Sequence, residues 1–453
     1  MKQKILVAAL VSGGLCSPLA HATNGMLMEG YGPIASGMGG ASMAYDNGAA
    51  GMANNPATLG LMAEGDSRLD LAVGGLHPDI VARMAGMPDA KSGGTAYYMP
   101  AAGWVKKSGV VAYGVGMFAQ GGMGTEYAAN TWVGAGSGKP SRSEVSVGNL
   151  IVPVSVEVAP DLHIGGSLDF VWGGMDLQMA MLGSSMMGMM AAGNLTVTAP
   201  APTMAMLSGF MAGPGNVGYF NFSDNSSFTG KANSTGYAGK LGMTYKLSDQ
   251  VTMGATYHSR TNLGDMKAAG ATVDLIGAGG VAMGTMTGDV TIVNFQFPET
   301  YGLGLAVQAT DGLMIAADYK RIAWSKVMKD FHMRFTTANF GGVAMDMKMP
   351  QNWADQDVVS LGMAFRAAEG VTLRAGANVA NNPVPANTVN PLFPATVTHH
   401  YTLGAGFAVS NVSQINASLS YVPKVTVTAP PASGGYSISH GQTNWQLMYS
   451  LKL

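Results

Sequence analysis

The chain has 453 residues, a formal net charge of −2, and only 11% charged side chains. Soluble proteins usually carry about 25% charged residues, so much of this surface is expected to avoid water. The low charge and the lack of a basic cluster exclude a nucleic-acid-binding protein. Beyond the N-terminus no apolar run is long enough for a membrane-spanning helix, and the membrane architecture that remains is a closed β-barrel, which pairs every backbone group internally.

The first residues are typical of a secretory signal peptide. Two lysines precede an apolar stretch over residues 5–15, and Ala20-His21-Ala22 forms an A-x-A cleavage motif. We therefore predict a signal peptide over residues 1–22, with cleavage before Thr23. The single cysteine, Cys16, falls within this leader, so the mature protein is expected to form no disulfide.

The segment that follows, residues 24–62, is nearly uncharged and rich in Gly and Ala. Such a segment packs closely inside a larger structure, but it has too little bulky apolar surface to fold alone. Two interpretations are open at this point: a flexible linker, and a plug held inside a container. The choice depends on whether the rest of the chain forms that container.

From residue 67 onward, runs of alternating residues recur to the chain end, and short turns alternate with long connections as they do in outer-membrane barrels. The short turns, such as Ala159-Pro160-Asp161 and Thr310-Asp311-Gly312, have residues that favour tight turns. The longer connections are predicted at 77–94, 120–146, 178–233, 262–297, 325–354, 381–398 and 425–437. This spacing predicts about fourteen strands, at residues 67–76, 95–105, 110–119, 147–159, 162–177, 234–247, 251–261, 298–309, 313–324, 355–367, 371–380, 399–409, 414–424 and 438–453.

The alternation within these strands separates an apolar face from a polar one. In residues 162–172 the polar face holds His163, Ser167 and Asp169, and the apolar face holds Leu162, Ile164, Leu168, Phe170 and Trp172. An apolar face suits lipid and a polar face suits a lumen. A soluble β-sandwich also alternates, but its polar face carries more charge and it rarely has so many strands. The predicted fold class is all-β, a transmembrane antiparallel β-barrel.

Several short motifs occur in order along the mature chain. They are Gly37-Met-Gly-Gly-Ala-Ser-Met-Ala-Tyr-Asp46, Asn55-Pro56-Ala57, His77-Pro78-Asp79, Phe297-Pro298-Glu299, Asn382-Pro383-Val384-Pro385 and Tyr401-Thr-Leu-Gly-Ala-Gly406. Their order resembles the FadL-type family (OMPP1/FadL/TodX-like) of outer-membrane transporters for long-chain fatty acids and other hydrophobic compounds. The resemblance implies a fourteen-stranded barrel with an N-terminal hatch in its lumen, so it favours the plug interpretation. The domains are then a signal peptide (1–22), a hatch (23–66) with the motif Asn55, Pro56 and Ala57, and a barrel (67–453).

The resemblance also implies a transport route. Ligand is captured among the outer loops, binds above the hatch, and leaves sideways into the membrane through a gap at a kink of the third strand. Glycine permits a kink and removes side chains from an opening, so the candidates for the lateral opening are Gly114, Gly116, Gly121 and Gly122. Glycines that merely ease curvature are the alternative at each position.

The ligand-binding candidates are of two kinds. Flexible thioethers and other apolar side chains fit irregular apolar ligands, and cations on predicted lumenal faces suit a fatty-acid carboxylate, although lumenal ion pairs explain them equally. The set is Met26, Leu27, Met28, Met117, Phe118, Arg260, Lys320 and Arg374. A Met-rich stretch over residues 175–211 is interpreted either as a cover of the mouth or as ordinary loop packing. No metal site and no cofactor are predicted.

Signatures of the common enzyme classes, such as G-x-S-x-G, H-E-x-x-H and the P-loop, do not occur in the sequence. We predict a monomeric channel in the outer membrane of a Gram-negative bacterium for passive uptake of hydrophobic compounds, foremost long-chain fatty acids. Aromatic hydrocarbons or alkanes are alternative substrates, and a surface adhesin or receptor and a lipase-like enzyme are alternatives of another class. The expected partners are hydrophobic small molecules, outer-membrane lipids and lipopolysaccharide, without nucleic acid.

Overall fold

The computed structural model describes residues 24–226, 229–337 and 339–453. The predicted signal peptide over residues 1–22 and its cleavage site before Thr23 lie outside the described residues. Within the described part, no helix is both long and apolar enough to cross a membrane.

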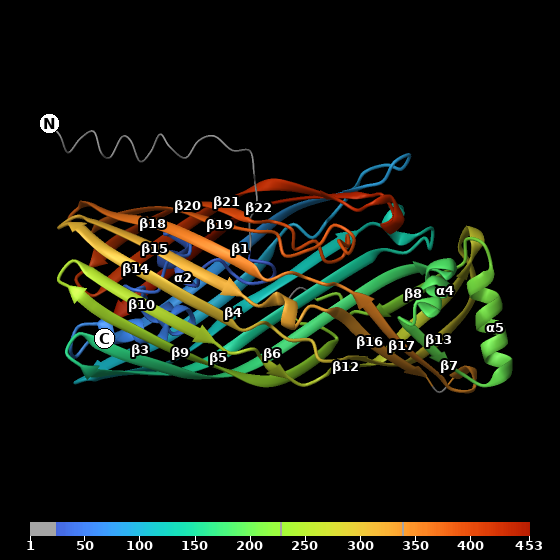
Figure 1. Cartoon of the computed structure of the whole chain (residues 1–453), viewed down its shortest axis with the longest axis horizontal. Helices are drawn as coiled ribbons and strands as arrows, with labels where there is room; N and C mark the ends of the chain where they lie inside the picture. Colours follow the sequence, from blue (N-terminus) through green and yellow to red (C-terminus); the bar gives the residue numbers. More distant parts are fainter. Residues whose placement is uncertain (1–23, 227–228, 338) are drawn as a thin grey trace.

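Most of the described chain after residue 66 forms antiparallel strands (Figure 1). The strands are β1 (Ser67–Arg83), β2 (Ala90–Lys91), β3 (Tyr97–Ser108), β4 (Val111–Tyr127), β5 (Ser141–Ala159), β6 (Leu162–Leu182), β7 (Leu195–Thr198), β8 (Val217–Phe222), β9 (Ala232–Ser248), β10 (Val251–His258), β11 (Asn262–Leu263), β12 (Met266–Gly277), β13 (Val281–Ile292), β14 (Thr300–Thr310), β15 (Leu313–Ile322), β16 (Asp330–Thr337), β17 (Val343–Pro350), β18 (Gln356–Ala368), β19 (Val371–Ala380), β20 (His399–Ser410), β21 (Ser413–Thr428) and β22 (Ser437–Lys452).

The helices are short. They are α2 (Gly32–Gly37), α3 (Gly51–Asn54), α4 (Gly183–Ala191) and α5 (Ala201–Ala212), with 3-10 turns η1 (Gly48–Ala50), η2 (Pro56–Leu61), η3 (Trp132–Gly134), η4 (Ala278–Gly280), η5 (Trp324–Lys326), η6 (Asn339–Gly341) and η7 (Pro431–Ser433).

The sheet closes on itself. Antiparallel pairing runs from β1 through β3, β4, β5, β6, β9, β10, β14, β15, β18, β19, β20 and β21 to β22. The ring is completed where β22 pairs with β1 over the register Arg68↔Lys452 to Arg83↔Ser437. Closure removes the free sheet edges that would otherwise leave unpaired backbone groups in lipid. Each predicted strand overlaps one strand of this ring.

Three of the predicted long connections hold strands that were not predicted from the sequence, and a fourth, 77–94, holds the two-residue strand β2. The stretch 178–233 contains β7 and β8, 262–297 contains β11, β12 and β13, and 325–354 contains β16 and β17. These strands pair with one another and with β6 and β9, and they form the wall at the right of Figure 1, where α4 and α5 pack together. The prediction of loops was wrong there. In β12 and β13, Ala, Thr and Gly leave little contrast between the faces, but β16 alternates the buried Phe331, Met333 and Phe335 with polar residues, so its strand signal was present in the sequence.

The predicted separation of faces is confirmed along the ring. On β6, Ile164, Leu168 and Phe170 are 41%, 68% and 52% exposed, whereas His163 and Asp169 are buried. Other ring strands expose large apolar side chains in the same way, among them Leu241, Leu303, Leu361, Leu403 and Leu447. A band of exposed apolar side chains around a closed barrel is the surface that contacts the acyl chains of a membrane.

The chain before β1 lies against the inner wall of this ring. Residues 24–62 are almost entirely buried, and Figure 1 shows α2 within the outline of the barrel. Strands on different sides of the ring hydrogen-bond to the segment: Asp318 Oδ2 of β15 accepts from the Ser42 amide at 2.6 Å, and Thr402 Oγ1 of β20 accepts from the Gly39 amide at 2.9 Å. The segment is therefore tied to the wall by polar contacts as well as by close packing.

Candidate functional site

A large cavity lies between residues 25–29 and the inner wall formed by β3, β4, β5 and β22. Its volume is about 270 Å³. The wall is mostly apolar and is built by side chains that include Ile80, Met99, Phe118, Val147 and Trp172. An apolar, partly enclosed space of this size with a few polar groups is typical of a small-molecule site.

Beside this cavity, two neighbouring strands of the barrel wall, β3 and β4, are not paired along their whole length. The ladder between β3 and β4 extends only from the pair Ser108↔Val111 to the pair Ala102↔Met117. Beyond the pair Ala102↔Met117, residues 97–101 of β3 pair with β1 and residues 118–127 of β4 pair with β5, but the two stretches do not pair with each other. The wall therefore has a lateral break between these two stretches, and residues from both stretches line the cavity.

Of the four glycines predicted at the opening, Gly121 and Gly122 lie at this break. Leu27 forms an isolated antiparallel bridge with Gly121, and the Gly122 amide donates to Met26 O at 3.0 Å. A Cβ on Gly121 would lie 2.0 Å from Met26 O, so only glycine permits this approach. The β4–β5 register shifts between Ala119 and Gly121, which is a bulge at the same level.

The other two glycines lie below the break, in the part of β4 that is paired with β3. Gly114 pairs with Val105 and Gly116 pairs with Gly103. A Cβ on Gly116 would lie 2.6 Å from Met52 Sδ of α3. The structure thus separates these two positions from the break and places Gly116 against the N-terminal segment.

The apolar candidates meet at the cavity. Met26, Leu27 and Met28 line it from the inside, and Met117 and Phe118 line it from β4. Met26, Leu27 and Phe118 are buried, whereas Met117 is 41% exposed. The five residues come from two segments far apart in the sequence. Met117 lies on the exposed face of β4 with Tyr113 and Val115, whereas Phe118 lies on the opposite, buried face.

The motif Asn55-Pro56-Ala57 lies deeper, where η2 packs against β5, β6 and β9. The Asn55 side chain caps η2 by accepting from the Ala57 amide at 3.1 Å, and it donates to Met43 O at 2.8 Å and to Met243 O of β9 at 3.2 Å. Pro56 occupies the first turn of η2, where a missing N–H costs nothing. A Cβ on Gly242 would lie 1.9 Å from Asn55 Oδ1, so a strand glycine makes room for the motif.

None of the predicted cations lines the cavity. Lys320 borders a separate space of about 30 Å³, close to His258 and to the buried ion pair of Lys240 with Asp169. Arg374 donates to Asn416 Oδ1 at 3.1 Å. Arg260 is exposed beyond the end of β10. The structure does not bring these three side chains together.

Sequence reasoning missed the polar side of the cavity. His440, Gln442 and Asn444 line it from β22, and Glu29 lines it from the N-terminal segment. The alternation of polar residues along the last strand is a signal that could have identified the first three. Glu29 is the first acidic residue after the predicted leader, but nothing in the sequence places it beside β22.

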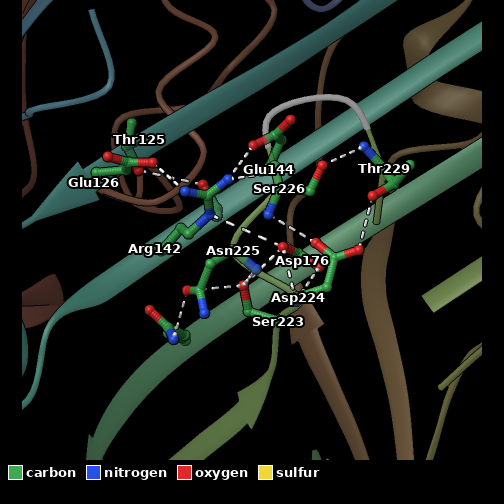
Figure 2. A network of polar contacts seen from close by, with 12 residues as sticks. Thr125, Glu126, Arg142, Glu144, Asp176, Ser223, Asp224, Asn225, Ser226 and Thr229 are labelled. Carbon is green, nitrogen blue, oxygen red and sulfur yellow. Dashed lines mark hydrogen bonds and ion pairs between the residues drawn. The ribbon is translucent and has the colours of Figure 1, made fainter. Parts of the chain in front are cut away.

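A network of polar contacts adjoins the cavity at Glu144 (Figure 2). Arg142 pairs with Glu126 and Glu144, its Nη2 donates to Ser226 O at 2.6 Å, and its Nε lies 3.9 Å from Asp176 Oδ2. Glu144 also lines the cavity.

Asp176 extends the network to the chain after β8. Its Oδ2 accepts from Ser223 Oγ at 2.7 Å and from the Asp224 amide at 3.2 Å. The cluster holds the carboxylates of Glu126, Glu144, Asp176 and Asp224 and the guanidinium of Arg142, so its net charge at neutral pH is negative. The part of the cavity next to Glu144 therefore lies in a region of negative potential.

No group of three or more His, Cys, Asp or Glu side chains in the described residues is placed to hold a metal ion.

The chain matches known proteins over nearly its whole length. Residues 20–443 match a family model described as "Outer membrane protein transport protein (OMPP1/FadL/TodX)". One curated relative, an uncharacterized protein from the 5′ region of the phosphoenolpyruvate carboxykinase gene of Chlorobium limicola, is 51% identical over 70 residues. That match covers 16% of this chain and 34% of the relative, so the chain spans about a third of the curated relative's length.

Solved structures share the whole fold. The crystal structure of the Pseudomonas putida toluene transporter TodX is 30% identical with a TM-score of 0.84, covering 94% of this chain and 99% of that one. The Ralstonia pickettii toluene transporter TbuX is 29% identical with a TM-score of 0.76 and the same coverage. A Pseudomonas aeruginosa FadL homologue is 16% identical with a TM-score of 0.71, covering 94% of this chain and 99% of that one, and shows the similarity of fold alone.

Proposed function

The chain belongs to the OMPP1/FadL/TodX family of outer-membrane transport proteins, and from this premise we propose that it admits small uncharged hydrophobic compounds, monoaromatic hydrocarbons foremost, by passive diffusion. Its barrel is an outer-membrane barrel of a Gram-negative bacterium, and its family consists of transport channels for hydrophobic compounds.

The cavity is the observation that supports this choice of substrate. An engineered cavity of about 150 Å³ lined by apolar side chains holds benzene, so a cavity of about 270 Å³ accommodates a substituted benzene ring. The relatives at about 30% identity carry toluene transporter in their names. Methionines and aromatic rings in the wall offer polarizable contacts to an aromatic ligand.

Charge argues against a fatty acid in this cavity. Among the described residues that line it, the two charged ones, Glu29 and Glu144, are both acidic, and neither Lys nor Arg is present. A carboxylate head would lose its water there without gaining a cation, which costs several kcal/mol. Long-chain fatty acids remain the alternative substrate, with alkanes next.

The N-terminal segment and the break in the wall fit the proposed route. Residues 24–62 act as the hatch that blocks the straight path, held by the Asn55-Pro56-Ala57 motif. The ligand leaves through the break between residues 97–101 and residues 118–127, beside Gly121 and Gly122. Release into lipid avoids exposing apolar surface to periplasmic water, which costs about 0.8 kcal/mol per methylene.

The proposed function is passive transport and involves no catalytic step. A receptor role for the outer loops is compatible with transport. We further propose that the protein works as a monomer surrounded by outer-membrane lipids and lipopolysaccharide.

Uptake by cells that lack their own transporter tests the proposal. Cells expressing the chain, with surface display confirmed, should accumulate labelled toluene faster than vector controls, with a smaller gain or none for labelled oleate. A gain for oleate alone would support the fatty-acid alternative, and a gain for neither would contradict a hydrophobic uptake channel.

A further inference from the structure

Four buried side chains, two in the cavity lining and two next to them, have polar atoms without close hydrogen-bond partners among the described residues. They are Glu29 (both oxygens), His400 (Nε2), Ser420 (Oγ) and Asn444 (Nδ2), each at most 3% exposed. Glu29 and Asn444 line the cavity. Ser420 is the cross-strand partner of Asn444 between β21 and β22. We call these four residues the polar subsite.

Neighbouring contacts fix the hydrogen-bonding character of His400. Asn378 Nδ2 donates to Ser360 Oγ at 2.9 Å and to Gly39 O at 3.3 Å, which leaves Asn378 Oδ1 as an acceptor. His400 Nδ1 lies 3.3 Å from this oxygen and therefore carries the ring hydrogen. In the neutral imidazole, Nε2 is then an acceptor.

Two acceptors consequently face each other. Glu29 Oε2 lies 3.9 Å from His400 Nε2, which is too far for a direct hydrogen bond. Lys320 of β15 is the cation that acts on Glu29 through space, and no hydrogen bond joins them. Among the described residues, the Ser420 hydroxyl is the one side chain that acts on Glu29 as a hydrogen-bond donor, so the second carboxylate oxygen lacks a donor. A buried carboxylate oxygen without a donor is costly, so the subsite favours an occupant that brings an O–H group.

On the other side, the subsite offers a donor. Asn444 Oδ1 accepts from Gln442 Nε2 at 2.7 Å, so the free group of Asn444 is its NH₂. A hydroxyl group can donate to Glu29 or His400 and accept from Asn444. A methyl group at the same place would leave all of these atoms unpaired.

We propose that the polar subsite binds the hydroxyl group of a phenol, with the ring in the apolar part of the cavity, and that Glu29 determines this specificity. The inference rests on the proposed function, because it uses the same cavity. It adds that hydroxylated monoaromatic compounds, and not only hydrocarbons, are ligands.

Binding to the full-length mature protein in lipid nanodiscs, which avoid competing detergent, tests the proposal. The probes are phenol, anisole and toluene, because anisole keeps the ring and the oxygen but lacks the O–H. The variants are Glu29→Met and the milder Glu29→Gln. Glu64→Gln, a change of an acidic residue outside the cavity, is the matched control.

A hydrogen bond to a charged group typically changes affinity by about tenfold or more. Glu29→Met should therefore weaken phenol binding about tenfold while toluene and anisole change less than about twofold. Glu29→Gln keeps an acceptor oxygen, so it should weaken phenol less, and Glu64→Gln should weaken none of the three ligands.

Equal changes for phenol and anisole, or an unchanged phenol affinity, would overturn the proposal and assign an ordered water to the subsite. The toluene measurement on the unmodified protein tests the proposed function by itself. Failure to bind toluene would count against the proposed hydrocarbon channel, whereas the ratio of phenol to anisole affinity tests only the subsite.

Discussion

The contact between the N-terminal segment and β4 depends on the absence of one side chain, so Gly121→Ala is an informative change. The added Cβ would lie 2.0 Å from Met26 O, whereas ordinary contacts begin at 3.4 Å. Residues 26 and 27 must therefore move by about 1.4 Å. That movement breaks the 3.0 Å hydrogen bond from the Gly122 amide to Met26 O.

The expected loss of free energy in the contact between the N-terminal segment and β4 follows from these two effects. Losing the hydrogen bond costs about 1 kcal/mol and the overpacking about 1–3 kcal/mol. The ladder between β4 and β5 continues on both sides of Gly121. The substitution should therefore destabilise the contact between the N-terminal segment and β4 and leave the pairing of β4 with β5 intact. Opening of residues 24–28 should become at least about 30-fold more frequent, and toluene should bind more weakly because Met26 and Leu27 are part of the cavity wall.

Hydrogen exchange measured by mass spectrometry on the protein in nanodiscs checks this prediction. Exchange of the peptide that contains residues 24–28 should accelerate in Gly121→Ala, while β4 and β5 stay protected. Gly166→Ala is the matched control, because a Cβ there meets nothing closer than 3.4 Å. Unchanged exchange and a toluene affinity within about twofold of the unmodified protein would refute the reasoning.

Three further predictions concern the hatch, its carboxylate and the exit. Burial raises the pKa of the Glu29 carboxyl from 4.5 to about 6. Since the folded state then binds the proton more tightly, the free energy of unfolding should fall by about 2 kcal/mol in total between a pH well below 4.5 and a pH well above 6, with the steepest fall between these two values. Urea titrations in lipid vesicles should show this slope and its loss in Glu29→Gln; an equal slope in both proteins would exclude Glu29 as its source. Asn55→Ala removes three hydrogen bonds and should cost about 2–4 kcal/mol, seen as faster exchange in residues 43–60; full protection would contradict a structural role for the motif. Ala119→Trp fills the break and should slow toluene uptake, whereas Ala317→Trp, on the exposed face of β15, should not; equal uptake by both would argue against the lateral exit.

The ring of strands was predictable because lipid and lumen impose opposite polarity on alternate residues. In β6 the exposed Leu168 and the buried Asp169 are neighbours in sequence, and that contrast marks a strand. The strands β12 and β13 were not predicted, because residues such as Ala268, Thr272 and Gly288 give little contrast between the two faces of each strand.

The candidate site was predictable only in part. The family resemblance placed an opening on the third strand and ligand at the N-terminus, and the residue types there, glycine at positions 121 and 122 and methionine at positions 26 and 28, fit close approach and apolar contact. The polar subsite could not be predicted, because Glu29 and Asn444 come together only when β22 pairs with β1 and closes the ring.

The predicted cationic residues are not among the residues that line the cavity. Lys320 and Arg374 were chosen because alternation placed them on lumenal faces, and Lys320 does border an interior space. Alternation fixes the face of a residue but not its height in the barrel. Both side chains lie away from the lining of the cavity, so they offer nothing to a carboxylate held there.

The central claim is that the cavity beside the break holds uncharged monoaromatic ligands. The most direct measurement is a crystal structure of the protein soaked with iodobenzene, with the iodine located by anomalous scattering. The account predicts an iodine peak between Met26 and Phe118 that excess toluene displaces and excess laurate does not. A peak only elsewhere in the barrel, or displacement by laurate alone, would contradict it.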